Sequence, residues 1–282
     1  MEFLDPKADL TFKRVFADHP HLLIDLLNSI LPIDFPIKEI EYLPTELLTN
    51  DPQNKLSIVD VKCVDQSGRK FIVEMQVAFV SDLFKRLIYN ASKVISKDLT
   101  RAQKFDQLNP VYMLCFLDSI MDKQTDVWFH HYAISHKVLS NRTMTGVDWF
   151  FIELPKWKKS INFNYRHKRD LWLTFLSDPE KLNKMYSTKE IEKFEELSEA
   201  LDLINASKYT EAQIRGIEHY LDTMRYNNSL LEGTRRDTLN EVLAIMAEIK
   251  NGVSVNEIAL KYGVDISYIV QLKEEIGGAG KG

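Results

Sequence analysis

The chain has 282 residues, of which 45% are hydrophobic and 27% are charged, so it can form one or two globular domains with a large core. The formal net charge of −5 excludes a globally basic protein, and any contact with nucleic acid must come from a local basic patch. No apolar run reaches membrane-spanning length, the N-terminal residues lack the apolar stretch of a signal peptide, and both cysteines lie in apolar segments. We therefore expect a cytoplasmic protein with reduced thiols and no membrane partner.

The first 160 residues carry the periodicities of a mixed α/β core. Apolar residues recur at helical spacing over residues 9–32, with a break at His19–Pro20, and again over residues 82–105. Strand patterns occur in further segments: residues 37–43, the hairpin at 57–77, residues 110–120, residues 127–135 and residues 147–155.

After residue 160 the pattern is almost entirely helical. We expect residues 1–160 to form the α/β core, residues 161–250 an α-helical region, and residues 251–282 a helix-turn-helix-like end with a flexible, glycine-rich tail. The turn of this end falls at Gly263, and the apolar residues expected to be buried around it are Ile258, Ala259, Val264, Ile266 and Ile269. Such a helix pair can bind DNA or pack against a partner protein. Its second helix carries little basic charge, and both alternatives stay open.

Polar side chains interrupt the apolar runs of the predicted hairpin, "SIVDVKCVDQSGRKFIVEMQV". Residues two apart on a strand share a face. Strict alternation therefore places Asp60 on one face of the first strand, with its neighbours Val59 and Val61 on the other. In the second strand Glu74 and Gln76 share a face. One interpretation is a solvent-facing side of a hairpin that simply carries acids.

The turn of the hairpin sets a more specific expectation. With Ser67 at the apex and Gly68 at a positive φ, Asp60 faces Glu74 directly, with Cβ atoms about 5 Å apart. Two facing carboxylates repel each other, and one of them tends to keep its proton. A bound Mg²⁺ removes this repulsion, because hard cations take one or two carboxylates together with water and phosphate oxygens. This arrangement is typical of phosphodiester hydrolysis.

A basic stripe follows the hairpin on the predicted helix. Arg86, Tyr89 (or Asn90), Lys93 and Lys97 recur at helical spacing. Beside an acidic metal site, these side chains could hold a phosphate backbone. The alternative is a solvated helix face without a partner.

In several successive blocks the sequence resembles the bacterial PD-(D/E)XK nuclease family transposases, which include the recombination-promoting nucleases. The blocks, in the family's order, are "DLTFKRVF", "IVDVKCVDQSGRKFIVEMQ", "LFKRLIYNASKVISKDL", "NPVYMLCFLD" and "FIELPKW". Together they cover about residues 5 to 160. The resemblance implies an α/β fold of the restriction-endonuclease-like type, with a central mixed sheet flanked by helices. It also implies Mg²⁺-dependent cleavage of DNA, in which Mn²⁺ could substitute.

The resemblance also assigns roles to individual residues. Asp60 and Glu74 would be catalytic metal ligands, and Asp9 on the first helix an additional acidic ligand. Gln76 occupies the position of the motif's lysine, which removes a positive charge but leaves an amide that can orient water. Val59 replaces the motif's proline, a change with little chemical consequence.

We therefore expect a Mg²⁺-dependent endodeoxyribonuclease that acts in recombination or transposition-like events. In it Asp60, Glu74 and Gln76 would be catalytic, and Arg86, Tyr89, Lys93 and Lys97 would contact DNA. Paired cuts would suit a homodimer. The alternatives are a nuclease-derived DNA-binding or regulatory protein that no longer cuts, and a protein-interaction module built on the helical half. A zinc site at His130, His131 and His136 is a weaker expectation, because strand histidines are usually structural.

Overall fold

A computed structural model describes residues 2–47, 56–78, 80, 82–97, 104–139, 142–159, 167–185 and 193–278. The chain divides into two compact units, residues 1–224 and residues 225–282. The first unit is an α/β structure built on one sheet, and the second is helical. Within the described residues, no helix combines the length and the apolar character needed to cross a membrane.

The sheet of the first unit is mixed. Its strands within the described residues run in the order β1 (Ile40–Tyr42), β2 (Val61–Asp65), β3 (Lys70–Gln76), β4 (Val111–Leu117), β6 (Thr143–Glu153) and β5 (Phe129–Ser135). The strands β1, β2 and β3 pair antiparallel, β3 and β4 as well as β4 and β6 pair parallel, and β5 lies antiparallel to β6. The predicted central mixed sheet is therefore confirmed, and strands form within each segment in which the sequence predicted one.

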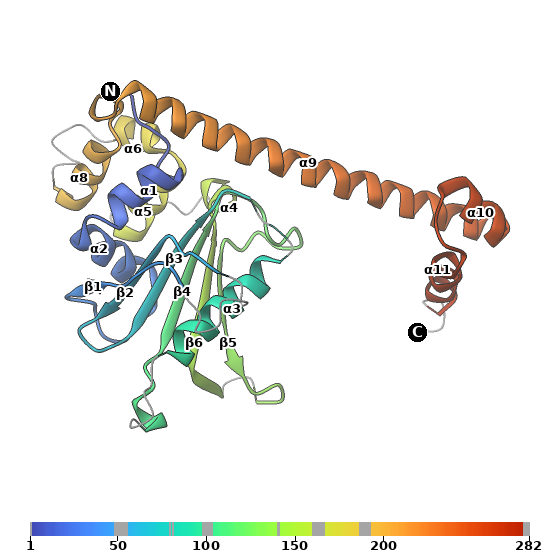
Figure 1. Ribbon diagram of the computed structural model, residues 1–282, viewed down its shortest axis with the longest axis horizontal. Coiled ribbons are helices and arrows are strands. Elements are labelled where there is room, and N and C mark those ends of the chain that lie inside the picture. The colour runs from blue at the N-terminus through green and yellow to red at the C-terminus, as the bar shows by residue number, and fades with distance from the viewer. Residues whose placement is uncertain are drawn as a thin grey trace. The chain divides into compact units, whose positions relative to one another are not determined.

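Helices pack against both faces of this sheet (Figure 1). One face packs against the helices α1 (Asp9–Phe16), α2 (Pro20–Ile30), α5 (Lys168–Ser177) and α8 (Glu195–Leu203). The other face packs against α3 (Leu83–Ser96), which connects β3 to the parallel strand β4. The helix α3 buries Leu83, Leu87, Ala91 and Val94, whose spacing puts one apolar stripe on the sheet.

Short helices connect the remaining parts of the first unit: η1 (Phe105–Gln107), α4 (Leu154–Lys159), α6 (Pro179–Met185) and η2 (Ala206–Lys208). The prediction that an apolar strand ends at Pro155 was wrong by two residues. The strand β6 ends at Glu153, and Pro155 lies in the first turn of α4. Proline is tolerated there because the first turn of a helix leaves its N–H groups without intrahelical partners.

The change in composition near residue 160 does not separate two cores. Leu171, Trp172 and Phe175 of α5 share a buried cluster with Phe12 and Phe16 of α1. The rings of Phe16 and Trp172 lie 5.6 Å apart. Helices from the region expected to form a separate helical part therefore complete the core on one face of the sheet, and the compact units divide only at residues 224 and 225.

The second unit contains the end of the long helix α9 (Glu211–Lys250), followed by α10 (Val255–Tyr262) and α11 (Ile266–Gly278). Ser254 and Glu257 form the N-terminal capping box of α10, and Gly263 ends this helix with a φ of 66°. Ile258, Ala259 and Ile269 are buried as expected. Ile266, the first residue of α11, is 50% exposed and does not join the cluster that they form, so its predicted burial was wrong. Residues 279–282 of the glycine-rich tail lie outside the described residues.

Candidate active site

The hairpin of β2 and β3 has the predicted register. Val61 lies opposite Val73 and Val64 opposite Lys70, which leaves the turn centred on Ser67. Gly68 in this turn has a φ of 83°, as expected. Asp65 stabilises the turn, since its Oδ1 accepts hydrogen bonds from the amides of Ser67 and Arg69, both at 2.9 Å.

Asp60 lies at a bend immediately before β2 rather than within the strand. Its Oδ2 accepts a 2.7 Å hydrogen bond from the backbone amide of Met75, the residue after Glu74. The bend interrupts the alternation of faces. Val59 therefore packs on the face covered by α3, whereas Val61 packs on the opposite face. The expectation that Val59 and Val61 share a face was wrong for this reason.

Glu74 lies in the middle of the sheet face that α3 covers. It is 4% exposed, and it lies beside Cys115 of the parallel strand β4. Burial, and after it the nearby charge of Asp60, raise the pKa of Glu74 to about 8. Burial also raises the pKa of Asp60, against the lowering effect of the Met75 amide. The two carboxyl groups thus lie close enough at the open end of the hairpin for the charge of Asp60 to act on Glu74.

Gln76 and Arg86 extend this pair on the same side of the sheet. The Nε2 group of Gln76 donates to Glu74 Oε2 at 3.2 Å, and Arg86 Nη2 donates to Gln76 Oε1 at 2.6 Å. The positive charge of Arg86 lowers the pKa of both Asp60 and Glu74. The sequence placed Arg86 among residues that contact DNA. The structure instead places its guanidinium one side chain away from the buried carboxylate of Glu74.

Asp9 lies near Asp60 and Glu74 but does not form a three-carboxylate group with them. Asp9 forms a 2.7 Å ion pair with Lys13 one turn further along α1. The charge of Asp9 raises the pKa of Asp60, and that of Lys13 lowers it. In the part of the chain that the structure describes, no three His, Cys, Asp or Glu side chains lie together as a metal-binding group. The carboxylates that the structure brings together are therefore Asp60 and Glu74.

Two residues near the carboxylates were not singled out by the sequence. Lys13 could have been found as the i+4 partner of Asp9. Tyr220 comes from α9, far away in the chain, and lines a hollow of about 250 Å³ together with Asp9. Burial raises the pKa of Tyr220, and the charges of Asp9 and Asp60 raise it further. No local pattern indicates this contact, because it depends on how α9 packs.

The residues of the predicted basic stripe do not share one environment. Tyr89 and Lys97 are exposed, whereas Lys93 is 7% exposed and donates to the carbonyl of Leu47 at 3.0 Å. The ammonium of Lys93 also lies 4.4 Å from the ring centre of Tyr89. With Arg86 bonded to Gln76, the stripe divides into an arginine at the carboxylates, a buried lysine and an exposed lysine.

His130 and His131 of β5 and His136, which follows this strand, each have a different partner. His130 Nε2 lies 2.8 Å from Glu153, His131 Nε2 lies 2.7 Å from Asp148, and His136 Nδ1 accepts from the amides of Val138 and Leu139. These contacts support the structural interpretation of the histidines.

The mixed sheet with helices on both faces, and a carboxylate pair at the end of its central hairpin, define a core of the PD-(D/E)XK nuclease type. The model of the PD-(D/E)XK nuclease family transposases matches residues 6–233. The chain belongs to this family. No curated protein and no solved structure matches the chain.

Proposed function

We propose that the chain is a divalent-metal-dependent endonuclease that hydrolyses phosphodiester bonds of DNA in recombination or transposition-like events. The observation that carries the proposal is the carboxylate pair of Asp60, bonded to the Met75 amide, and Glu74, linked through Gln76 to Arg86. Membership of the nuclease family supports a hydrolytic reaction on DNA. The cytoplasmic location and a homodimer that makes paired cuts remain predictions within this proposal.

The donor chemistry of the pair fits a hard divalent cation. Near neutral pH the protein otherwise keeps a proton on Glu74, since the carboxyl is buried beside Asp60. Mg²⁺ or Mn²⁺ would replace that proton, and two carboxylates with water are a usual ligand set for Mg²⁺. When bound, the cation supplies a Lewis acid for the phosphoryl oxygens and makes water a stronger nucleophile at neutral pH.

The chain's own residues would orient the reaction. Asp60 and Glu74 would hold the cation, with Asp60 fixed by the Met75 amide. Water attacks phosphorus and loses a proton to solvent, the bond from phosphorus to the leaving oxygen breaks, and the leaving oxygen takes up a proton from solvent to become a hydroxyl group. Gln76 has no group that takes up the proton lost by water, so its role is to position Glu74. Arg86 supplies the positive charge that the motif's lysine would otherwise bring to the site.

Nicking of a supercoiled plasmid tests the proposal. With Mg²⁺ or Mn²⁺, the wild-type chain should convert the plasmid to open circles, and EDTA should stop the reaction. Asp60→Asn should lower the rate by about 100-fold or more, whereas Asp106→Asn, at an exposed site in η1, should leave it unchanged. If the wild type and Asp60→Asn both bind DNA and neither cuts it, the protein is the non-cutting, DNA-binding alternative.

A further inference from the structure

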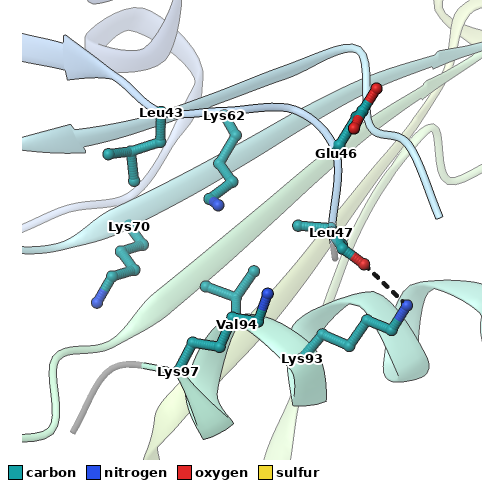
Figure 2. A pocket seen from close by; sticks show the side chains of 8 residues that line it. All are labelled: Leu43, Glu46, Leu47, Lys62, Lys70, Lys93, Val94 and Lys97. Atoms are coloured by element: carbon teal, nitrogen blue, oxygen red, sulfur yellow. Dashed lines mark hydrogen bonds between the residues drawn. The ribbon is translucent and has the colours of Figure 1, made fainter. Parts of the chain in front are cut away.

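A second feature of the α3 face is a pocket of about 200 Å³ that four lysines line. They come from three elements: Lys62 from β2, Lys70 from β3, and Lys93 and Lys97 from α3 and its end. Figure 2 shows the side chains of Lys62 and Lys97 extending into the space between the strands and the helix. The pocket therefore collects positive charge from residues that are separated in the sequence.

The acid in this lining does not face the lysines. Among the described residues that line the pocket, Glu46 is the one acid, and it is exposed. In Figure 2 its carboxylate points away from the lysine ammonium groups. The ammonium of Lys93 is buried and donates to the carbonyl of Leu47 at 3.0 Å, so this lysine forms the wall of the pocket. The ammonium of Lys62 donates to the carbonyl of Pro44 at 3.3 Å, but this contact is exposed and the ammonium has two further N–H groups that can bind an anion.

The other lysines repel one another. Lys62, Lys70 and Lys97 all line one pocket of about 200 Å³. Partial burial lowers the pKa of Lys70, and the charge of Lys62 lowers it further. Like charges held together in this way are stabilised when an anion enters. Lysine ammonium groups bind phosphate as compact point charges, and the pocket is large enough for one phosphate group.

The pocket and the carboxylate pair lie on the same face of one strand. Lys70 and Glu74 are four residues apart on β3 and share a face, which separates them by about 13 Å along the strand. A nucleic acid strand that passes the carboxylates along β3 and α3 would therefore present another phosphate at the lysines.

We propose that Lys62, Lys70 and Lys97 bind a phosphate group of the DNA backbone at a distance of several nucleotides from the phosphate that is cut. The inference rests on the proposed function, since it takes DNA as the substrate. It adds Lys62 and Lys70 to the residues that contact DNA and assigns Lys93 to the pocket wall.

The proposal is tested by measuring the Kd of the full chain for a fluorescein-labelled DNA duplex. Fluorescence anisotropy in the presence of EDTA reports the binding. The variant Lys62→Gln/Lys97→Gln removes two pocket charges. The control Lys85→Gln/Lys137→Gln removes two charges at exposed positions outside the pocket. The pocket variant should raise Kd about tenfold at 100 mM KCl, and the slope of log Kd against log [KCl] should fall by about 0.9, as expected for one lost phosphate contact. The control should change Kd by less than about twofold.

Equal Kd values for the pocket variant and the control would overturn the proposal, as would a wild-type chain that does not bind the duplex. Lys97→Gln alone, at an exposed position after α3, provides a variant that keeps the fold, and it should weaken binding about threefold. Calorimetry with inorganic pyrophosphate tests whether the ligand of the pocket is a free anion or a phosphate of the DNA backbone. Saturable pyrophosphate binding that the pocket variant loses, without any loss of DNA affinity, would assign the pocket to a free anion and overturn the DNA contact.

The outcome is separable from that of the nicking assay. A wild-type chain that never nicks, but whose DNA affinity falls in the pocket variant, refutes hydrolysis and supports the phosphate pocket. If the wild-type chain nicks DNA and the pocket variant binds DNA as tightly as the control does, hydrolysis is supported and the phosphate pocket is refuted.

Discussion

Arg86 Nη2 donates a 2.6 Å hydrogen bond to Oε1 of Gln76, while the amide nitrogen of the same glutamine donates to Glu74. The glutamine side chain thus separates a buried carboxylate from a guanidinium. In the motif that the sequence resembles, a lysine stands at the position of Gln76. The pair of Gln76 and Arg86 brings a positive charge to the same side of the sheet from a different element.

The first prediction concerns this pair. Arg86→Gln should lower nicking by about 10- to 100-fold, the usual effect of losing a residue that supports a metal ligand. Gln76→Lys in the Arg86→Gln background should restore a large part of the activity, because lysine returns the lost charge. Gln76→Lys alone should give no gain, since it sets two cations against each other. Initial nicking rates of the four proteins form a double-mutant cycle.

Additive effects in this cycle would contradict a shared role for the two residues. DNA affinity, measured separately in EDTA, is the control. If Arg86→Gln weakens DNA binding as much as it slows nicking, Arg86 is a backbone contact, as the sequence alone indicated.

The second prediction concerns pH. The pKa of Glu74 is raised to about 8 by burial and by Asp60, so the folded, metal-free protein binds a proton more tightly than the unfolded chain. This contribution to stability is complete below the ordinary glutamate pKa of about 4.3 and is lost as pH rises to about 8. Glu74→Gln has no such loss. Its free energy of unfolding should therefore rise relative to wild type between about pH 5 and 8, by a few kcal/mol at most, and then stay constant.

Urea unfolding across this pH range, in EDTA, measures the difference. Mg²⁺ at about 100 times its Kd should then stabilise the wild type at pH 8 by about 2.7 kcal/mol and leave Glu74→Gln unchanged. Parallel stability curves for the two proteins, with and without Mg²⁺, would show that Glu74 neither holds a proton nor binds the cation.

The third prediction concerns a buried cluster outside the candidate active site. The side chain of Glu153 is fully buried and accepts hydrogen bonds from the amide of Met121 at 2.9 Å and from Lys156 Nζ at 2.8 Å, and it also contacts His130. Lys156→Met would leave the carboxylate buried without its cation, at a cost of about 3–5 kcal/mol in the free energy of unfolding. Mn²⁺ affinity, measured by calorimetry on the folded variant, should not change.

Arg215→Met provides a comparison for this variant. Arg215 and Glu211 form an ion pair in which the side chains are 69% and 88% exposed, and solvent screens such a pair. Urea unfolding should detect no loss of stability for it. If Lys156→Met also shows no measurable loss in the free energy of unfolding, the buried pair of Lys156 and Glu153 contributes little to stability.

The sequence predicted the register of the hairpin because two local rules agree there. Gly68 can adopt the positive φ that the turn requires, and the polar Glu74 and Gln76 alternate with the apolar Val73 and Met75 in the second half of β3. The same rules missed the bend at Asp60. The hydrogen bond from Met75 that holds this bend comes from the other strand, and no periodicity of the first strand encodes it.

The contacts of α3 were less predictable. Helical spacing predicted one stripe of Arg86, Lys93 and Lys97, but spacing does not determine which groups each side chain contacts. Lys93 can be buried because it donates a hydrogen bond to the carbonyl of Leu47, whereas Arg86 donates a hydrogen bond to Gln76. The packing of Trp172 beside Phe16 is a contact across more than 150 residues, and composition alone placed a boundary between them.

The carboxylate pair, Gln76 and Arg86 all come from residues 60–86, a single β–β–α segment. The loops that must close to bring these groups together are therefore short, and their closure costs little chain entropy. The sheet as a whole depends on β4 and β6, which pair with the segment only after longer loops close. The candidate catalytic residues thus come from one local supersecondary unit, whereas the sheet around that unit is assembled from more distant parts of the chain.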